Sequence, residues 1–315
     1  MKAKFISLLL MLSLLLTACG AEPNTTENSD KLTVVTSFYP IYLLAREVVE
    51  GAEGVELKNM AQPQTGCLHD YELTVSDIKL LEGADVLIIN GGGMESFLEQ
   101  AMERYPHLQV VDTSVGIELL EEEEHHHHEG ETEEEHAGHD HDHEGNPHIW
   151  LSPARAAEQV EHISAALCEL DAAEAEVFEK NAADFRGEAE ALLEQAAAIG
   201  IPEGENSAVF HEGFAYFAEL FCMENVFSVF ADEYEMPSAK ELAEAAEEAK
   251  RHGIRFFLTA DDSGRIYGET LAAEVDEQIV LLDPLTTAEE ENLSYLERME
   301  KNIEAIEKHW KEVAK

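Results

Sequence analysis

Short apolar runs alternate with helix-type stretches through the first third of the chain. Residues 85–90 (DVLIIN) are apolar almost without interruption, which is typical of a strand buried on both faces of a parallel sheet. Three glycines at residues 91–93 end this run, and Ser76 and Asp77 suit the start of a helix. The alternation predicts further strands at residues 32–38, 55–61 and 108–112, and helices at residues 41–50, 75–83 and 94–105.

The alternation returns after two long helical stretches, residues 153–170 and 172–198. Repeated β-α units predict an α/β fold in which parallel sheets are flanked by helices. We expect two such lobes, at residues 31–170 and 200–315, joined by one long rigid helix at residues 171–199 that runs for about 40 Å. In the second lobe the pattern predicts strands at residues 208–211 and 226–230 and helices at residues 213–221, 237–252 and 293–311, with residues 254–260, 269–275 and 279–282 continuing the alternation.

The first thirty residues have a different character. Lys2 and Lys4 precede an apolar run that is too short to span a bilayer comfortably, which predicts a signal peptide at residues 1–18. The sequence Leu-Thr-Ala-Cys that ends at Cys19 resembles the bacterial lipobox. By that resemblance Cys19 becomes a lipidated N-terminus, residues 19–30 form a polar tether, and the protein is extracytoplasmic and anchored to the membrane. The alternative is an ordinary signal peptide with an incidental cysteine.

The chain is strongly acidic, with 67 Asp and Glu against 20 Lys and Arg and a net charge of −47. This balance argues against a nucleic-acid partner, which requires a basic surface, and suits a protein that attracts cations. Three further cysteines, Cys67, Cys168 and Cys222, are an odd number without a CxxC pair. A structural zinc site made of thiolates is therefore not expected. A sulfur ligand from Cys67 remains open.

Residues 121–145 (EEEEHHHHEGETEEEHAGHDHDHEG) lack any apolar periodicity and are expected to form a loop. Imidazoles among carboxylates make a loose, multivalent cation trap, which we expect to collect metal near a tighter site or to sense its abundance. The alternative is an acidic linker without function. Eight histidines lie in this segment: His125, His126, His127, His128, His136, His139, His141 and His143.

Seven histidines lie outside that segment. Four of them are interpreted as surface residues or as residues satisfied by local partners: His107, His162, His252 and His309. The other three, His69, His148 and His211, each follow a strand or loop beside polar turn residues. Ligand sites of parallel sheets lie at the carboxyl ends of the strands, and neutral imidazole is a common metal ligand. These three rings would form an ion site between the lobes, unless each has a structural role.

Several segments resemble the metal-binding lipoproteins of bacterial zinc and manganese ABC importers: TSFYPIYLLAREV, GCLHDYELTVSDIKLLEGADVLIINGGGMESFL, NPHIWLSP, VFHEGFAYFAELF and VLLDPL. The resemblance extends from about residue 32 to residue 311. It implies two α/β lobes bridged by a long helix and one divalent cation in the cleft, with His69, His148 and His211 as ligands. It also implies an ABC permease and its ATPase as partners, and we expect a monomer.

The fourth ligand is where the chain departs from that family, which usually has a carboxylate after a Phe-rich strand. Here the stretch reads FFLTADDSGRIYGE, with Thr259 at the expected position. Asp261 is the favoured substitute, Asp262 is the alternative, and water could also fill the place. Glu212, next to a ligand, is expected to orient an imidazole from outside the ligand set. Three imidazoles favour Zn²⁺ over Mn²⁺, which prefers oxygen ligands.

Two other functions fit parts of the sequence. A zinc hydrolase would need a second histidine in HEGFA, but Ala215 occupies that position, and no GxSxG motif occurs, so an enzyme is not expected. A surface adhesin or metal buffer of the same fold remains open. The rigid linking helix argues against wide hinge closure, and we expect a small shift of the second lobe with local reordering around His211 and Asp261.

Overall fold

A computed structural model describes residues 31–61, 71–98, 104–121, 145–228, 238–260, 263–288 and 292–314. By the spacing of Cα atoms the chain divides into residues 1–31 and residues 32–315, and every helix and strand given below belongs to the second part. The predicted ligands His69 and Asp261 therefore lie outside the described residues, as do Asp262 and residues 122–144.

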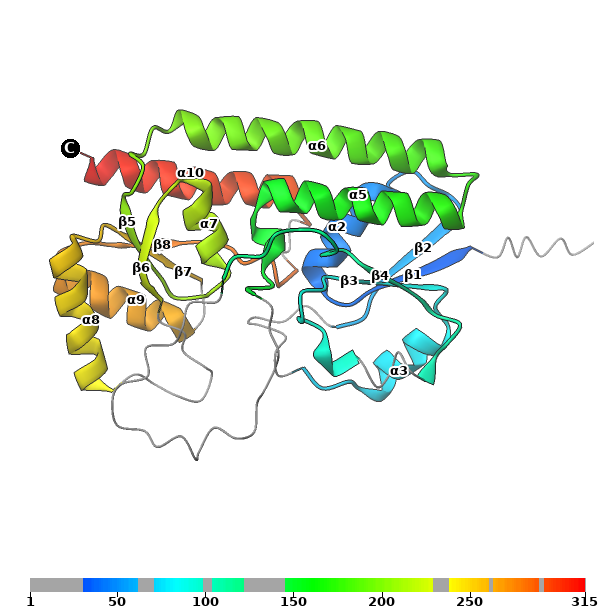
Figure 1. The fold of residues 1–315 in the computed structure, drawn as a ribbon, viewed down its shortest axis with the longest axis horizontal. Coiled ribbons are helices and arrows are strands. Elements are labelled where there is room, and N and C mark those ends of the chain that lie inside the picture. Colours follow the sequence, from blue (N-terminus) through cyan, green and yellow to red (C-terminus); the bar gives the residue numbers. More distant parts are fainter. Residues whose placement is uncertain are drawn as a thin grey trace, which may run out of the picture. The chain divides into compact units, whose positions relative to one another are not determined.

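The first sheet has four parallel strands in the order β2-β1-β3-β4 (Figure 1). The strands are β1 (Leu32–Thr36), β2 (Val55–Asn59), β3 (Val86–Ile89) and β4 (Gln109–Asp112). Successive side chains of a strand point to opposite faces. Accordingly, Val34 and Ile88 pack with α2 (Tyr39–Val49), whereas Val35 and Leu87 pack with α3 (Val75–Glu82) on the other face.

The second sheet repeats this arrangement with four parallel strands in the order β6-β5-β7-β8. The strands are β5 (Asn206–Val209), β6 (Glu224–Ser228), β7 (Phe256–Thr259) and β8 (Ile279–Leu281). One face packs with α7 (Phe214–Leu220) and α10 (Tyr295–Val313). The other face packs with α8 (Ala239–His252) and α9 (Ser263–Glu274). The predicted fold class, two lobes with parallel sheets flanked by helices, is confirmed.

The long helix α6 (Ala175–Ala198) follows α5 (Pro153–Leu170) and leads to the second sheet (Figure 1). At about 1.5 Å per residue its 24 residues span roughly 36 Å. It packs against α5, α2 and α10, so its buried face, which includes Phe178 and Phe185, contacts helices of both lobes. The exact lobe boundaries at residues 170, 199 and 200 stay a prediction. None of the described helices combines the length and apolar character needed to cross a bilayer.

One local prediction is confirmed and another needs correction. Ser76 and Asp77 lie in the first turn of α3, as expected, and the capping side chain is Thr74, which accepts from the Asp77 N–H while the Asp77 carboxylate accepts from the Thr74 N–H. The helix predicted at residues 94–105 begins instead as a turn that leads to a 3₁₀ helix at Ser96–Leu98. Its start differs because the Glu95 carboxylate accepts backbone N–H groups of the preceding glycine turn.

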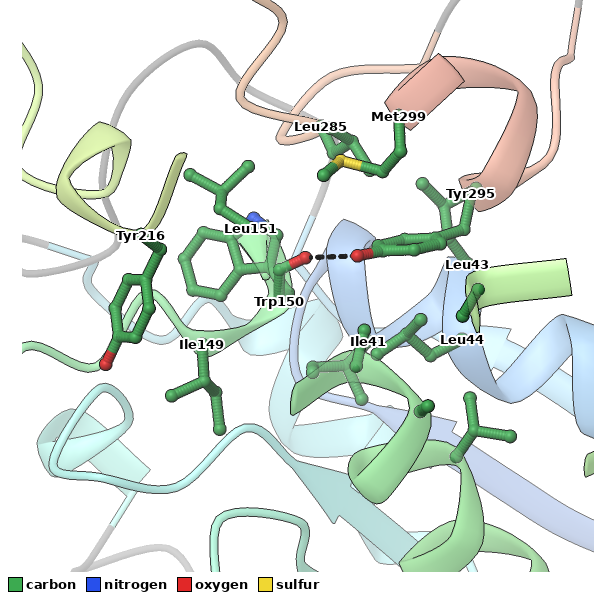
Figure 2. Close-up of a cluster of buried hydrophobic side chains, with 14 of the residues drawn as sticks. Ile41, Leu43, Leu44, Ile149, Trp150, Leu151, Tyr216, Leu285, Tyr295 and Met299 are labelled. Atoms are coloured by element: carbon green, nitrogen blue, oxygen red, sulfur yellow. Dashed lines mark hydrogen bonds between the residues drawn. The ribbon is translucent and has the colours of Figure 1, made fainter. Parts of the chain in front are cut away.

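A short turn, the 3₁₀ helix η3 (Ile149–Leu151), connects the cores of the two lobes (Figure 2). The Trp150 side chain is almost fully buried, with its indole N–H donating to the Pro284 carbonyl oxygen at 3.0 Å. The Tyr295 hydroxyl donates to the Trp150 carbonyl oxygen at 2.7 Å. On the other side the Trp150 ring meets Phe38 edge to face, with ring centres 5.1 Å apart. Residues of the first lobe, of η3 and of the second lobe thus form one continuous apolar cluster.

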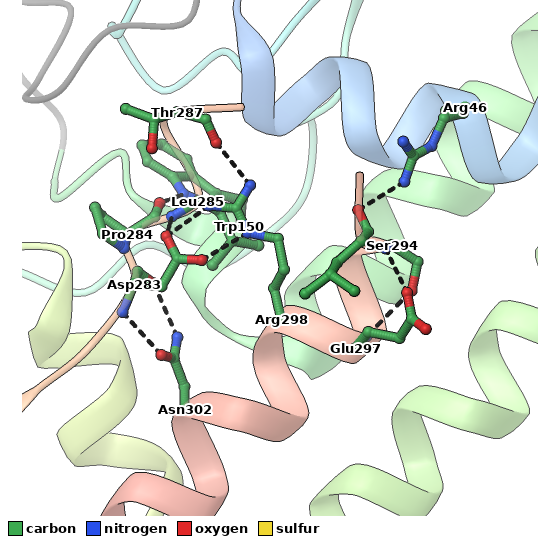
Figure 3. A network of polar contacts seen from close by, with 11 residues as sticks. Arg46, Trp150, Asp283, Pro284, Leu285, Thr287, Ser294, Glu297, Arg298 and Asn302 are labelled. Carbon is green, nitrogen blue, oxygen red and sulfur yellow. Dashed lines mark hydrogen bonds and ion pairs between the residues drawn. The ribbon is translucent and has the colours of Figure 1, made fainter. Parts of the chain in front are cut away.

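The loop after β8 is held by a buried arginine (Figure 3). Arg298 of α10, 1% exposed, binds both carboxylate oxygens of Asp283 at 2.6 and 2.7 Å and the Thr287 carbonyl oxygen at 2.8 Å. The Asn302 side chain bonds both backbone groups of Asp283. Since this loop carries the Pro284 carbonyl that receives the Trp150 N–H, the arginine also fixes η3.

Replacing Arg298 with Met is expected to destabilise the protein by about 2–3 kcal/mol, because the partly buried Asp283 would lose its bidentate partner. Urea unfolding of the metal-free protein measures this. The matched control on the same helix is Lys311→Met, which removes an exposed pair with Glu307 and should change stability by less than about 1 kcal/mol. Equal effects of the two substitutions would contradict the role assigned to Arg298.

Candidate metal centre

The two sheets share one strand order, and in each the connections change side at the same place. That place lies between β1 and β3 in the first lobe and between β5 and β7 in the second. Ligands of open parallel sheets bind beyond the carboxyl ends of the strands at such a switch point. His211 lies two residues after the end of β5, and Ala260 directly follows β7, its paired neighbour. His211 and Ala260, the residue before Asp261, thus lie at the same edge of the second sheet.

The structure brings two of the predicted ligands together. The imidazole rings of His148 and His211 have centres 5.0 Å apart and an interplanar angle of 83°. His148, directly before η3, is fully buried, whereas His211 is partly exposed. Two rings that each bind one tetrahedral ion through a nitrogen about 2.0–2.1 Å away have their centres roughly 5 Å apart. The observed separation therefore suits a shared ion.

The His148 ring is surrounded by polar and aromatic neighbours. Its Nδ1 lies 2.9 Å from Asn146 Oδ1 and 3.4 Å from Glu212 Oε1, and its centre lies 4.9 Å from the Trp150 ring. The Glu212 carboxylate, expected to orient an imidazole, thus lies beside the histidine of the distant segment. Asn146, in the NPHIW motif, was not predicted, because an amide two positions before a histidine gives no sign in the sequence that it contacts the imidazole ring.

His211 has a different environment. The Gly213 backbone N–H donates to His211 Nδ1 at 3.2 Å, and the Phe214 ring lies 5.5 Å from the imidazole. Nδ1 accepts in this bond, so the proton of the neutral ring lies on Nε2. An ion that binds His211 Nδ1 must displace the Gly213 N–H, whereas an ion that binds Nε2 requires the ring proton to leave that nitrogen.

Gly213 allows the two histidine segments to approach each other. A Cβ atom at this position would lie 2.6 Å from a Leu151 methyl carbon and 3.0 Å from the His148 Cβ. Neither distance is tolerated without movement of the neighbours. A larger residue at position 213 requires the Leu151 side chain to turn aside and His148 or the His211 segment to move by a few tenths of an ångström.

The remaining predicted site residues are not placed. His69, Asp261, Asp262, Cys67 and Cys19 lie outside the described residues, as do all eight histidines of the acidic segment. Thr259, at the position of the expected carboxylate, is fully buried, and its hydroxyl donates to the Ala260 carbonyl oxygen at 3.2 Å. Within the described ranges, no three His, Cys, Asp or Glu side chains lie close enough together to hold a metal.

The histidines interpreted as satisfied do have other partners. His162 Nδ1 contacts the Thr113 carbonyl oxygen at 2.8 Å, and His309 Nε2 contacts the Arg255 carbonyl oxygen at 2.7 Å. His252 pairs with Glu248 on α8, and the His107 ring lies against Tyr105. This agrees with the interpretation from the sequence.

A buried carboxylate supports the backbone beside His148. Glu95, 4% exposed, accepts from the Ser37 hydroxyl at 2.7 Å and from the backbone N–H groups of Asn90 and Gly91 at 2.7 and 3.0 Å. The Asn90 side chain in turn donates to the Pro147 carbonyl oxygen at 2.8 Å. Burial raises the pKa of Glu95 to about 7, against the stabilising effect of its hydrogen bonds.

Comparison with protein families identifies one match. The family described as "Zinc-uptake complex component A periplasmic" (ZnuA) matches residues 34–309, which is most of the chain. This chain belongs to the ZnuA family. Two similar proteins are the high-affinity zinc uptake system protein ZnuA of Bacillus subtilis and the zinc-binding lipoprotein AdcA of Streptococcus pneumoniae, each 30% identical. The alignments cover 93% of this ZnuA-family chain and 93% of the former, and 96% of this chain but only 60% of the latter.

Comparison with solved structures finds proteins of the same fold. Zn(II)-bound AdcA from Streptococcus pneumoniae superposes with a TM-score of 0.70 at 25% identity, over 89% of this chain and 57% of that one. FpvC from Pseudomonas aeruginosa in complex with Ni²⁺ superposes with a TM-score of 0.73 over 90% and 97%. The laminin-binding adhesin Lmb from Streptococcus agalactiae reaches 0.73 over 88% and 99%. The last two, both 22% identical, show the fold alone.

Gly213→Ala is expected to lower the free energy of unfolding by about 1–3 kcal/mol, because the new methyl group overlaps Leu151 and His148. Chemical unfolding of the metal-free protein measures it. The control is Gly187→Ala in the exposed face of α6, where nothing lies within 4 Å of the added atom. There the change should raise stability by roughly 0.5–1 kcal/mol. A Gly213→Ala protein as stable as wild type would show that the two segments are not in close contact.

The substitution Glu95→Gln tests whether the buried Glu95 carboxyl group has a raised pKa. Its folded-state pKa of about 7 lies above the usual 4.5, so folding takes up a proton between these pH values. Wild-type stability should therefore fall by roughly 3 kcal/mol as pH rises from about 4.5 to about 7, and this fall should be missing in the variant. Unfolding free energies across that range give the difference, with Glu82→Gln on the exposed side of α3 as control. Parallel profiles for Glu95→Gln and wild type would refute the assignment.

Proposed function

We propose that this chain is an extracytoplasmic receptor that binds one Zn²⁺ with high affinity and delivers it to an ABC-type importer. The observation that carries the proposal is the 5.0 Å separation of the His148 and His211 rings, from segments 63 positions apart. The family description and the zinc-related names of the two relatives at 30% identity support it. His69 and Asp261, with Asp262 as the alternative, would complete the ligand set.

The same proposal includes the partners of the receptor and its location at the membrane. The partners are a membrane permease and its ATPase, and the receptor acts as a monomer. Residues 1–18 are a signal peptide and Cys19 carries the lipid that holds residues 19–30 at the membrane. The anchor raises the concentration of the receptor near its permease. The relative AdcA is named a lipoprotein, which supports this arrangement.

The proposal favours zinc over manganese because three of its four ligands are imidazoles. Mn²⁺ is the alternative cargo, since the same fold is found in FpvC with Mn²⁺. No catalytic step is part of the proposal, because Ala215 stands where a zinc protease of the HExxH type needs its second histidine.

Release of the ion is proposed to involve small, local motions. The contacts of Trp150 with Pro284 and Tyr295, and the packing of α6 on helices of both lobes, would all break in a wide clamshell movement. The second lobe would therefore shift only slightly, with the residues around His211 and Asp261 reordering.

The mature wild-type protein is expected to bind one equivalent of Zn²⁺ tightly. His148→Ala and His211→Ala should each weaken this binding by at least about 100-fold, because losing a ligand costs more than losing a partner behind a ligand. Metal content and competition with a chelating dye measure both values. His252→Ala on α8 is the control and should bind as wild type does. If both ligand variants kept the wild-type affinity, the site would lie elsewhere.

A second arm of this measurement separates the site from the histidine-rich segment. Leu120 and Asn146 form an antiparallel bridge just outside it, so residues 122–144 should be replaced by a short Gly-Ser turn that keeps the bridge. The single tight site should remain, and any additional weak binding should disappear. Loss of the tight site in this variant would make the segment itself the site.

A further inference from the structure

Asn146 lies between the histidine-rich segment and His148, and each of its polar groups has a partner. Its backbone N–H donates to the Leu120 carbonyl oxygen at 2.8 Å, and its carbonyl oxygen accepts from the Tyr216 hydroxyl. Its side-chain Nδ2 donates to the Glu212 carbonyl oxygen at 2.9 Å. Its Oδ1 accepts from the His148 backbone N–H at 3.1 Å and faces the His148 Nδ1 at 2.9 Å. Such full satisfaction is what a buried amide requires.

These contacts determine the orientation of the amide and, with it, the tautomer of His148. A carbonyl oxygen only accepts and a backbone N–H only donates. The amide nitrogen must therefore face Glu212, and the amide oxygen must face His148. Since Oδ1 only accepts, the His148 Nδ1 carries the proton and donates it. The lone pair of the neutral ring then lies on Nε2, the nitrogen that a metal can bind.

The same amide spans the two lobes. His148 precedes η3 and α5, whereas Glu212 follows His211 and precedes α7. One side chain thus contacts the ring of one predicted ligand and the backbone next to another. Tyr216 of α7 holds Asn146 in turn, since its hydroxyl also accepts the Leu120 N–H at 3.1 Å, and the Arg155 guanidinium lies 4.7 Å from its ring centre.

We propose that Asn146 is a positioning residue of the metal centre. Its oxygen holds His148 in the tautomer that presents Nε2, and its nitrogen sets the distance between His148 and the His211 segment. This inference rests on the proposed function. Glu212 also faces His148 Nδ1, but at 3.4 Å and with 27% of its side chain exposed, so water competes for it. The closer and buried Asn146 is therefore the principal partner.

The first test reads the tautomer directly in the metal-free, full-length mature protein. Long-range ¹H–¹⁵N spectra of ¹⁵N-histidine-labelled protein distinguish the two neutral forms, and the His148 signals are those lost in His148→Gln. Wild type and Asn146→Asp should show the Nδ1–H form, since a carboxylate oxygen also accepts. Asn146→Ala should shift His148 toward the Nε2–H form. A purely structural residue would not move this readout.

The second test measures Zn²⁺ affinity by dye competition. Asn146→Ala should bind about 10- to 100-fold more weakly than wild type, the usual effect of removing a partner behind a ligand. Asn146→Asp should recover only part of the loss, because it keeps an acceptor for His148 Nδ1 but loses the donor to the Glu212 carbonyl oxygen. Glu212→Gln should weaken binding less than Asn146→Ala does. If Asn146→Ala does not fold, Asn146→Ser replaces it, because its shorter hydroxyl does not reach Nδ1.

The inference is overturned if the variant without the acceptor keeps the Nδ1–H form or binds Zn²⁺ within about threefold of wild type. It is also overturned if Glu212→Gln produces the larger change. Failure of wild type to bind one Zn²⁺ would refute the proposed function instead, and the tautomer reading, made without metal, would still stand.

Discussion

The lack of a side chain at residue 213 is the constraint on which the centre of this molecule depends. His148 and His211 belong to different lobes, and their rings come within 5.0 Å only because the chain after His211 passes directly against His148 and Leu151. The contacts of Trp150 with the second lobe stabilise this close approach of the two segments. The pairing of these two histidines is thus a product of packing at the boundary between the lobes, and neither lobe contains it alone.

Around this histidine pair, buried polar residues form a chain of hydrogen bonds in which each residue holds the next in place. The Glu95 carboxylate organises the end of β3, the Asn90 amide there holds Pro147, and Asn146 contacts the His148 ring. On the far side the Arg298–Asp283 pair fixes the loop that receives Trp150. Buried polar groups are costly unless every one is satisfied, which makes such a chain of hydrogen bonds rigid. Such rigidity would suit the proposed receptor, in which the ion is held tightly and released by small movements.

The fold was largely predictable from the sequence, because its strands and helices follow local patterns. The apolar run at Val86–Ile89 and the amphipathic stretch of α5 have the expected boundaries within one residue. The pairing of His148 with His211 was predictable in kind, since both follow strand or loop ends. A local sequence pattern does not show which residues contact each other when they lie far apart in the sequence. Asn146 contacts Glu212 across 66 positions and Arg298 contacts Asp283 across 15, and the turn at Glu95 is held by the Ser37 hydroxyl from 58 positions away.

The strand pairings also bear on the order in which the chain folds. Each sheet is built from residues close in sequence, β1 to β4 within residues 32–112 and β5 to β8 within residues 206–281, whereas Trp150 meets Pro284 and Tyr295 across 134 and 145 positions. Closing long loops is entropically slower than closing short ones. We therefore expect each half to assemble first and the seam between them to close last. A chain caught before that final step would have its sheets complete while His148 and His211 were still apart.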